Sequence, residues 1–199
     1  MIAVVDYEAG NLKSVETALE KLGADFFISS DPLRLAEADK MIFPGVGEAA
    51  QAMAVLKKTG LDLVLKEFAL TGKPLLGICL GSQILFDSSE ESDTPCLGIL
   101  PGKVCRFSTE MGLKIPHMGW NTLTHSDHPL FLNLPQDKSF YFVHSYYVEP
   151  QNKADIIGSS DYGHSFTAAV ARKNVMATQF HPEKSGEWGL LILQNFIDL

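Results

Sequence analysis

Cysteine is scarce in this sequence, and its spacing predicts no covalent framework. The 199 residues contain three cysteines, Cys79, Cys96 and Cys105. The number is odd and no Cys-x-x-C pair occurs, so the pattern suits neither a set of disulfides nor a zinc site. Each cysteine therefore has to be interpreted from its local surroundings.

Long apolar runs and basic residues are also scarce. No run reaches the roughly 18 apolar residues that a membrane-spanning helix needs, and the first six residues lack the basic segment of a signal peptide. The formal net charge is -8, from 24 acidic and 16 basic residues. Non-specific nucleic-acid binding depends on Lys and Arg at phosphates. We therefore expect a cytoplasmic protein that binds neither nucleic acid nor membrane, with one domain over residues 1–199.

Apolar strands alternate with helical stretches in the first half, which predicts parallel β-α units. The second half contains closely spaced strands and then a final helix. Together they predict an α/β protein whose mixed, mainly parallel central sheet has helices on both faces and an antiparallel section in the second half. The expected strands are 2–5, 25–28, 40–43, 74–78, 97–100, 103–107, 139–148, 155–159, 166–171 and 174–180; the expected helices are 11–22, 48–57, 61–70, one from about 80, and 186–199.

The most informative segment is residues 75–83 (LLGICLGSQ), which has the form G-x-C-x-G between an apolar strand and a helix. Flanking glycines allow the sharp turn that holds a nucleophile out at the end of a strand. Cys79 would then lie at a helix N-terminus, where thiolate is favoured over thiol. A free cysteine is more often a small buried apolar residue, and we interpret Cys96 and Cys105 in that way.

His181 is the histidine best placed to act as a base for Cys79. It ends the apolar segment 175–180, and Pro182 and Glu183 follow it. Residues i and i+2 of an extended chain point the same way, so Glu183 can bind one imidazole nitrogen and leave the other for the cysteine. An ordinary strand-end turn is the alternative for this segment on its own. We interpret His144 as a satisfied, partly buried histidine outside the triad.

The two segments together resemble the class I, or triad, glutamine amidotransferases. Residues 77–83 look like the nucleophile motif of that family, and residues 179–183 (QFHPE) look like its base motif. The resemblance implies a flavodoxin-like class I amidotransferase fold. It also implies hydrolysis of glutamine's side-chain amide by Cys79, His181 and Glu183, with no metal or organic cofactor.

Further segments resemble one branch of that family, the glutaminase subunits of imidazole glycerol phosphate synthase. The resemblance runs from residue 2 to residue 199. Two residues depart from the branch: Glu8 stands where it generally has glycine, and Ser82 where it generally has methionine. The matching segments are 6–7 with 10–11, 43–47 (FPGVG), 116–121 (PHMGWN), 141–147 (YFVHSYY) and 181–186 (HPEKSG).

The branch implies roles for residues outside the triad. The backbone N–H of Leu80 and one from Val46-Gly47 are expected to stabilise the oxyanion. The residues expected to hold glutamine are Gly45, Gln83, Ser145 and Tyr146. The residues expected at or near a partner interface are Asn11, Trp120, Asn121, Tyr141 and Lys184.

The same resemblance implies a heterodimer with a TIM-barrel cyclase. That partner accepts ammonia through its interior and makes imidazole glycerol phosphate and an aminoimidazole carboxamide ribonucleotide in histidine biosynthesis. We expect the Val46-Gly47 peptide to turn when the cyclase is liganded. The isolated chain should therefore be largely inactive.

Three alternatives share parts of this pattern. The chain could serve another synthase, such as those of anthranilate, GMP or pyridoxal phosphate synthesis, because the triad alone does not discriminate among them. It could be a catalytically inactive binding module on the same scaffold. It could also be a cysteine peptidase of related fold, although a peptidase gives no reason for Gln83.

Overall fold

The computed structural model describes residues 1–8 and 12–199. The predicted interface residue Asn11 therefore lies outside the described residues. The strands are β1 Ile2–Val5, β2 Phe26–Ser29, β3 Lys40–Gly45, β4 Leu75–Cys79, β5 Ser88–Ser89, β6 Thr94–Pro95, β7 Gly102–Arg106, β8 His117–His125, β9 Lys138–His144, β10 Tyr146–Pro150, β11 Ile156–Asp161, β12 Ser165–Arg172 and β13 Val175–Thr178. The helices are α1 Leu12–Lys21, α2 Pro32–Ala36, α3 Ala49–Thr59, α4 Leu61–Leu70, α5 Leu80–Ile84 and α6 Gly186–Asp198, with 3-10 turns η1 Glu91–Asp93, η2 Thr109–Met111, η3 Pro129–Phe131, η4 Lys153–Asp155 and η5 Pro182–Lys184.

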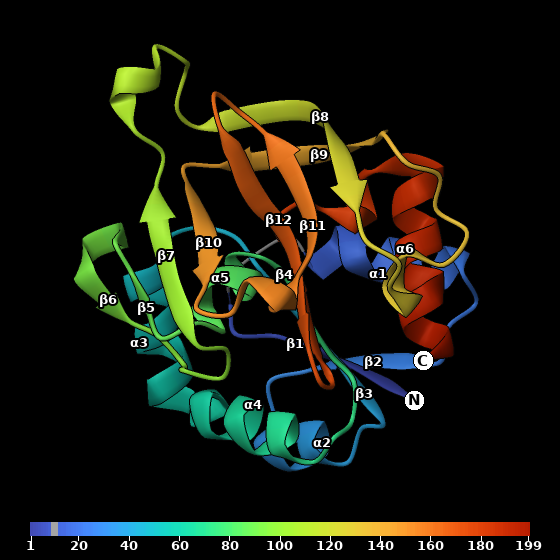
Figure 1. Cartoon of the computed structure of the whole chain (residues 1–199). Coiled ribbons are helices and arrows are strands. Elements are labelled where there is room, and N and C mark those ends of the chain that lie inside the picture. The colour runs from blue at the N-terminus through green and yellow to red at the C-terminus, as the bar shows by residue number, and fades with distance from the viewer. Residues whose placement is uncertain (9–11) are drawn as a thin grey trace.

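One large mixed sheet organises the chain (Figure 1). Its main path runs β2-β1-β3-β4-β13-β12-β10-β7-β5-β6. The strands from β2 to β13 pair in parallel, whereas β12, β10 and β7 are joined by antiparallel pairs. The strands β11, β8 and β9 extend the antiparallel part away from this path. The predicted fold class is confirmed.

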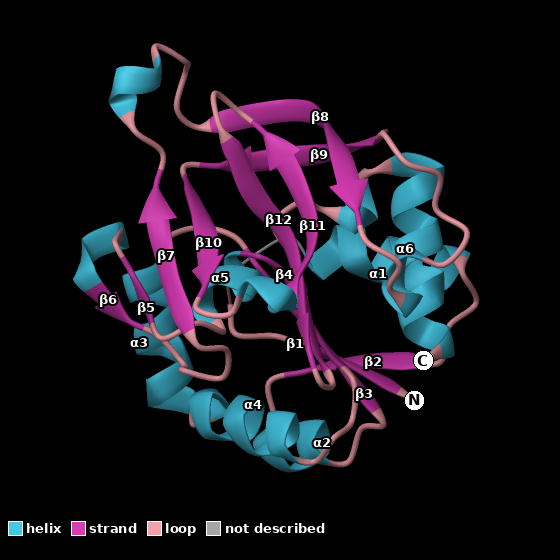
Figure 2. Cartoon of the chain, in the orientation of Figure 1, coloured by secondary structure: helices cyan, strands magenta, loops and turns pink. Residues whose placement is uncertain are grey.

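Helices cover both faces of the parallel section, with α1 and α6 on one side and α2 to α4 on the other (Figure 2). Alternate residues of each strand face the two helical layers. In β1, Ala3 and Val5 pack with α3 and α4, whereas Val4 packs with α1 and α6. In β3, Met41 packs in the layer of α3 and α4, and Ile42 packs in the layer of α1 and α6. Two apolar layers therefore fix the parallel strands, and with them the position of the strand ends.

Some expected strand boundaries were wrong. Residues 97–100 form no strand, because their N–H groups donate to the carbonyls of Ile84, Leu85 and Phe86 at the end of α5. The segment 139–148 breaks at Ser145 into β9 and β10, which pair with different neighbours. The sequence analysis also did not predict α2, β5, β6 or β8. Within the part of the chain that the structure describes, no helix has the length and apolar character needed to cross a membrane.

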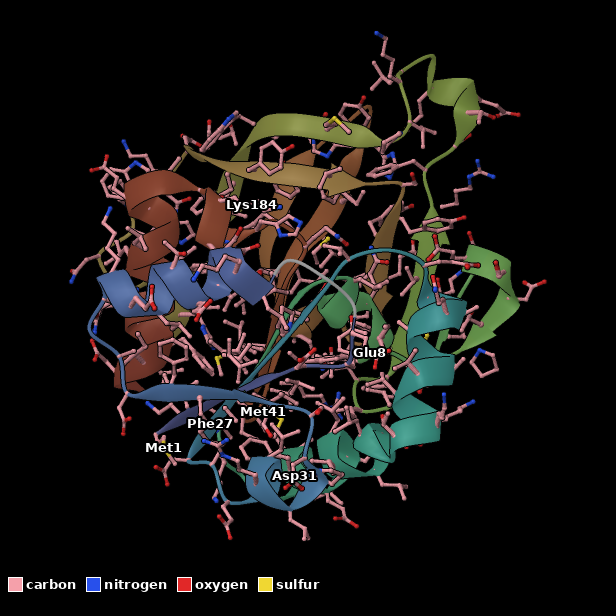
Figure 3. The ribbon with its side chains drawn as sticks, turned by 180° about the vertical axis from the view of Figure 1, so that it is seen from behind. Met1, Glu8, Phe27, Asp31, Met41 and Lys184 are labelled. Atoms are coloured by element: carbon pink, nitrogen blue, oxygen red, sulfur yellow. The ribbon has the colours of Figure 1, made fainter. Side chains whose placement is uncertain are left out.

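Glu8, one of the two departures from the branch pattern, has a left-handed backbone with φ 66°. It lies just beyond β1, near the start of α3 (Figure 3). With Val46 and Glu48 it lines a small cavity. A left-handed backbone is unfavourable for a residue with a β-carbon and easy for glycine. The glycine that the branch generally has at this position therefore fits the backbone seen here.

Glu8→Gly is expected to stabilise the chain by about 0.5–1 kcal/mol, because relief of the left-handed strain exceeds the added freedom of the unfolded chain. Urea unfolding of both proteins measures the change. Glu37→Gly is the control, because Glu37 is exposed and has an ordinary φ of -78°. That variant should lose stability, and a loss in Glu8→Gly as well would refute the strain argument.

Candidate active site

Cys79 is the last residue of β4, and α5 begins at the next residue. Its backbone has φ 55° and ψ -112°, which is a strained conformation for a residue other than glycine. The strain turns the chain sharply from strand to helix and holds the thiol at the carboxyl end of the parallel strands. The predicted nucleophile turn therefore has the expected shape.

Two glycines permit this turn because the backbones approach closely. A β-carbon built on Gly81 would overlap the carbonyl of Phe43 in β3. One built on Gly45, which pairs with Cys79 across the sheet, would overlap the hydroxyl of Tyr7. The glycines around the nucleophile thus bring α5 against the end of β3.

Gly81→Ala is expected to destabilise the chain by about 1–3 kcal/mol, because the added methyl group has to push α5 away from β3. The same displacement moves Leu80 and Cys79, so cysteine reactivity should fall as well. Thermal unfolding and the rate of thiol alkylation measure the two effects. An alanine variant with unchanged stability and reactivity would show that the backbones are not in close contact.

His181 directly precedes η5, and its ring is almost completely buried. Nδ1 lies 2.7 Å from Oε1 of Glu183, as the i and i+2 spacing predicted. Nε2, the other ring nitrogen, is buried and makes no hydrogen bond of normal geometry. Burial opposes protonation of His181, but hydrogen bonding and charge from Cys79 and Glu183 outweigh it and raise the pKa of His181 to about 10. The ring can therefore exchange protons on the side facing the thiol.

A cavity of about 180 Å³ lies in front of this pair. The Leu80 N–H, in the first turn of α5, has no partner inside the helix. It is well placed to bind an oxyanion formed on a carbon bonded to the Cys79 sulfur. The residues that line the cavity are Val46, Gly47, Cys79, Leu80, Gln83, Glu91, Val143, Tyr146 and His181. Most of the predicted catalytic, oxyanion and substrate residues thus meet at one place.

Gly45 and Ser145 do not line this cavity. Gly45 lies beneath it, paired with Cys79. Ser145 is the residue between β9 and β10, and its carbonyl accepts the N–H of Phe107. The second departure from the branch pattern, Ser82, is buried and donates its hydroxyl to the carbonyl of Cys79 at 2.6 Å. Serine thus supplies a polar contact that methionine lacks.

Two residues of the site were missed by the sequence analysis. Glu91 provides the only carboxylate among the residues that line the cavity. Burial raises the pKa of Glu91, although its carboxylate accepts the Ala49 N–H at 2.7 Å. Gln179 is buried, and its Nε2 lies 3.9 Å from the Cys79 sulfur. Gln179 was visible within the QFHPE motif, whereas the pattern around Glu91 is that of a surface turn.

The predicted interface residues that the structure describes gather on β8, β9 and η5. Trp120 pairs with Tyr141 across the two strands, and Trp120 is 60% exposed. The Tyr141 carbonyl accepts the N–H of His181 at 3.0 Å. Lys184 is exposed and is labelled in Figure 3. The exposed Trp120 therefore lies next to Tyr141, whose ring in turn contacts His181, the residue predicted to act as the base.

The other two cysteines lie away from the cavity. Burial raises the pKa of Cys96 to about 11, and burial together with Glu149 raises the pKa of Cys105 to about 12. Both therefore stay in the unreactive thiol form at neutral pH. In residues 1–8 and 12–199, no group of three or more His, Cys, Asp or Glu side chains is arranged to hold a metal ion.

Residues 3–199 match the family model for class-I glutamine amidotransferases. The chain belongs to this family. It is also 50% identical to "Imidazole glycerol phosphate synthase subunit HisH" of Neisseria meningitidis serogroup B, with 98% of each chain covered. The protein of the same name from Dehalococcoides mccartyi is likewise 50% identical, with 100% of this chain and 97% of that protein covered.

Solved structures support the amidotransferase fold. A chain of PurLQS from Thermotoga maritima superposes with a TM-score of 0.76 at 21% identity, covering 99% of this chain and 97% of that one. A second structure, a glutamine amidotransferase, gives 0.76 at 19% identity and covers 98% and 99%. At these identities the likeness describes the fold alone.

Proposed function

We propose that the chain hydrolyses L-glutamine and delivers the ammonia to a cyclase subunit of imidazole glycerol phosphate synthase in histidine biosynthesis. The observation that carries the proposal is the cavity in which Cys79, His181 and Leu80 meet, with Glu183 bonded to the far side of the imidazole. Support also comes from relatives of the family that are 50% identical over nearly their whole length.

In the proposed reaction, His181 Nε2 takes the proton of the Cys79 thiol, and the sulfur attacks the side-chain carbonyl carbon of glutamine to form a tetrahedral oxyanion. The N–H of Leu80 and one from Val46-Gly47 stabilise that charge. His181 gives a proton to the departing ammonia, and then activates a water that cleaves the glutamyl thioester. Glu183 keeps the His181 imidazole in position and stabilises its positive charge in both steps. The sum is glutamine plus water to glutamate plus ammonia.

The amino-acid end of glutamine needs a partner of each charge. The Glu91 carboxylate lines the cavity and suits the substrate's ammonium group. Gln83 and Tyr146 line the same space, while Gly45 adjoins it through its pairing with Cys79 and is assigned to glutamine from the family resemblance. We assign these residues to substrate binding. Ser145 keeps that assignment only from the family resemblance.

The proposed partner is a TIM-barrel cyclase bound over Trp120, Asn121, Tyr141 and Lys184. Met118 and Trp120 are 63% and 60% exposed, neighbours on one face of β8. Exposed apolar side chains grouped in this way are typical of a protein interface. The Tyr141 carbonyl accepts the N–H of the buried His181, so a partner bound over Tyr141 would lie close to the residue that we propose protonates the leaving ammonia. We also propose that residues 1–199 act as one domain in the cytoplasm.

Trp120→Ala is expected to weaken binding of the cyclase roughly tenfold or more, because exposed tryptophans are frequent binding hot spots. Isothermal titration of the two subunits measures the change. Leu70→Ala is the matched control, since Leu70 is 87% exposed but ends α4, which leads into the opposite end of β4. Equal affinities of the two variants would place the interface elsewhere.

The test of the proposed function is glutamate release from L-glutamine by the purified chain. It is measured alone, with the cyclase, and with the cyclase and its nucleotide substrate. We expect a low rate for the free chain and stimulation of roughly 5- to 150-fold in the liganded complex. Stimulation by an anthranilate, GMP or pyridoxal phosphate synthase instead would favour another branch. No glutamate in any mixture would favour a binding module.

A further inference from the structure

Two buried histidines outside the triad face each other across β8 and β9. His117 and His144 are a cross-strand pair, and His117 Nδ1 lies 2.9 Å from His144 Nε2. They are 3% and 6% exposed, with Phe107 and Phe166 packed against both rings. The proposed hydrolysis uses neither ring, so this buried polar contact needs another reason.

The neighbouring groups fix every proton in this pair. Asn121 Oδ1 accepts the N–H of Thr122, so Asn121 Nδ2 is the donor to His117 Nε2 at 3.2 Å. His117 therefore carries its proton on Nδ1 and donates it to His144 Nε2. His144 in turn carries its proton on Nδ1 and donates to the Tyr146 carbonyl at 2.7 Å. All the hydrogen bonds run in one direction, and each ring nitrogen has one role.

Both rings are neutral in this arrangement. Burial lowers the pKa of His117 to about 4 and the pKa of His144 to about 3. A proton added to either ring would set two N–H groups against each other. The chain of hydrogen bonds is therefore intact throughout the neutral range.

The chain continues from the Tyr146 carbonyl to the nucleophile. The same carbonyl accepts a hydrogen bond from Gln83 Nε2 at 3.0 Å. Gln83 Nε2 also donates to Gln179 Oε1 at 2.8 Å, and Gln179 Nε2 lies 3.9 Å from the Cys79 sulfur. The position of His144 thus sets the position of Tyr146 and Gln83, which line the Cys79 cavity.

The other end lies next to the surface proposed for the partner. Asn121 follows Trp120 in β8 and is half-buried, with Nδ2 also donating to the Asp161 carbonyl at 2.7 Å. We propose that His117 and His144 are positioning residues that couple the placement of Asn121 to Gln83 and the glutamine side of the cavity. The inference rests on the proposed function, since it assigns Gln83 to glutamine and Asn121 to the partner.

The hydrogen-bond chain is tested without any activity by nitrogen-15 NMR of the histidine rings at pH 7. Both rings should be the neutral form protonated on Nδ1. Asn121→Ala should shift the His144 ring resonances although the two residues do not touch. Thr124→Ala, an exposed change on the same strand, should leave them in place. A ring protonated on Nε2, or a His144 signal unmoved by Asn121→Ala, would overturn the proposal.

The consequence for catalysis is tested with the cyclase complex by a double-mutant cycle. His117→Phe and Asn121→Ala should each raise KM for glutamine roughly tenfold with little change in kcat, and the double variant should be no worse than one alone. His164→Phe, in the same aromatic cluster but outside the chain of hydrogen bonds, should keep the wild-type KM. Additive effects would refute the coupling.

The outcomes separate the two proposals. A wild-type complex without glutaminase activity refutes the proposed function. The NMR experiment still tests the ring protonation and the effect of Asn121→Ala in that case, because it does not depend on activity. An active complex with unchanged KM in His117→Phe refutes the positioning role alone. Thermal unfolding of each variant confirms that a change in KM comes from a folded protein.

Discussion

Cys79→Ala is expected to lower the rate of glutamate release by roughly 10⁴-fold or more, because the covalent intermediate of the proposed reaction forms on the Cys79 sulfur. The residues that line the cavity contain one thiol, and His181 is the imidazole beside it. Loss of the sulfur removes the attacking atom and leaves the oxyanion donors with nothing to stabilise. The rate in the cyclase complex, measured by coupled glutamate detection, gives the effect.

Cys105→Ala is the matched control for that experiment. Cys105 is also buried and free, but its sulfur lies 3.3 Å from Glu149 and its pKa is raised to about 12 by burial and that carboxylate. The control should keep wild-type kcat and KM. A Cys79→Ala protein with normal glutaminase activity would refute the assignment of the nucleophile, and an inactive Cys105→Ala protein would make a folding effect the better explanation.

Glu183→Gln should have the second largest effect, a fall in kcat of roughly 10³- to 10⁴-fold. Glutamine keeps the size of the side chain but not the charge that supports the imidazolium. The 2.7 Å contact from His181 Nδ1 to Oε1 becomes a contact with an amide whose orientation no longer fixes the ring. Steady-state kinetics of the complex measure the loss, and a variant within tenfold of wild type would show that His181 does not depend on Glu183.

The same variant has a pH signature. The pKa of His181 in the folded chain is raised to about 10, against about 6.5 in an unfolded chain. The stability that this ring contributes is therefore fully present below pH 6.5 and is lost as the pH rises toward 10. Wild type should exceed Glu183→Gln in stability most at pH 6, and the gap should close by pH 10. A gap that widens with pH would contradict the raised pKa.

The parallel half of the fold could be predicted because its strands are short apolar runs set between helical periods. The packing of β1 and β3 between two helical layers follows from continuous apolar runs, residues 2–5 and 41–43. The segment 97–100 is equally apolar, but its N–H groups cap the end of α5. Only tertiary contacts separate those two outcomes.

The antiparallel half was harder because its strands carry polar residues in positions that long-range pairing buries. In β8 the polar His117 is buried beside His144, whereas the apolar Met118 and Trp120 are exposed. This is the reverse of the usual pattern, in which apolar side chains are buried and polar ones are exposed. Ser145 divides what looks like one long strand, because β9 and β10 pair with different neighbours. Such a strand cannot be recognised from alternation alone.

The geometry around Cys79, His181 and Glu183 could be predicted because each residue lies in a recognisable local pattern, a glycine-flanked strand end or a His-Pro-Glu turn. Their catalytic roles stay predictions. The place of Glu91 in the cavity could not be predicted, because no sequence motif marks η1 and only the folded chain brings it to Cys79. The histidine pair was missed for a related reason: a histidine that looks inert alone gains a partner only when β8 and β9 meet. The single domain over residues 1–199 and the cytoplasmic location stay predictions.

The most direct test of the central claim is covalent trapping of the nucleophile by a chloroketone analogue of L-glutamine. The cyclase complex is treated with one equivalent of the analogue, and the modified residue is identified by peptide mass spectrometry. The account predicts one adduct, on Cys79, that excess L-glutamine prevents and that forms more slowly in Glu183→Gln. An adduct on Cys96 or Cys105, or labelling of Cys79 that glutamine does not slow, would contradict it.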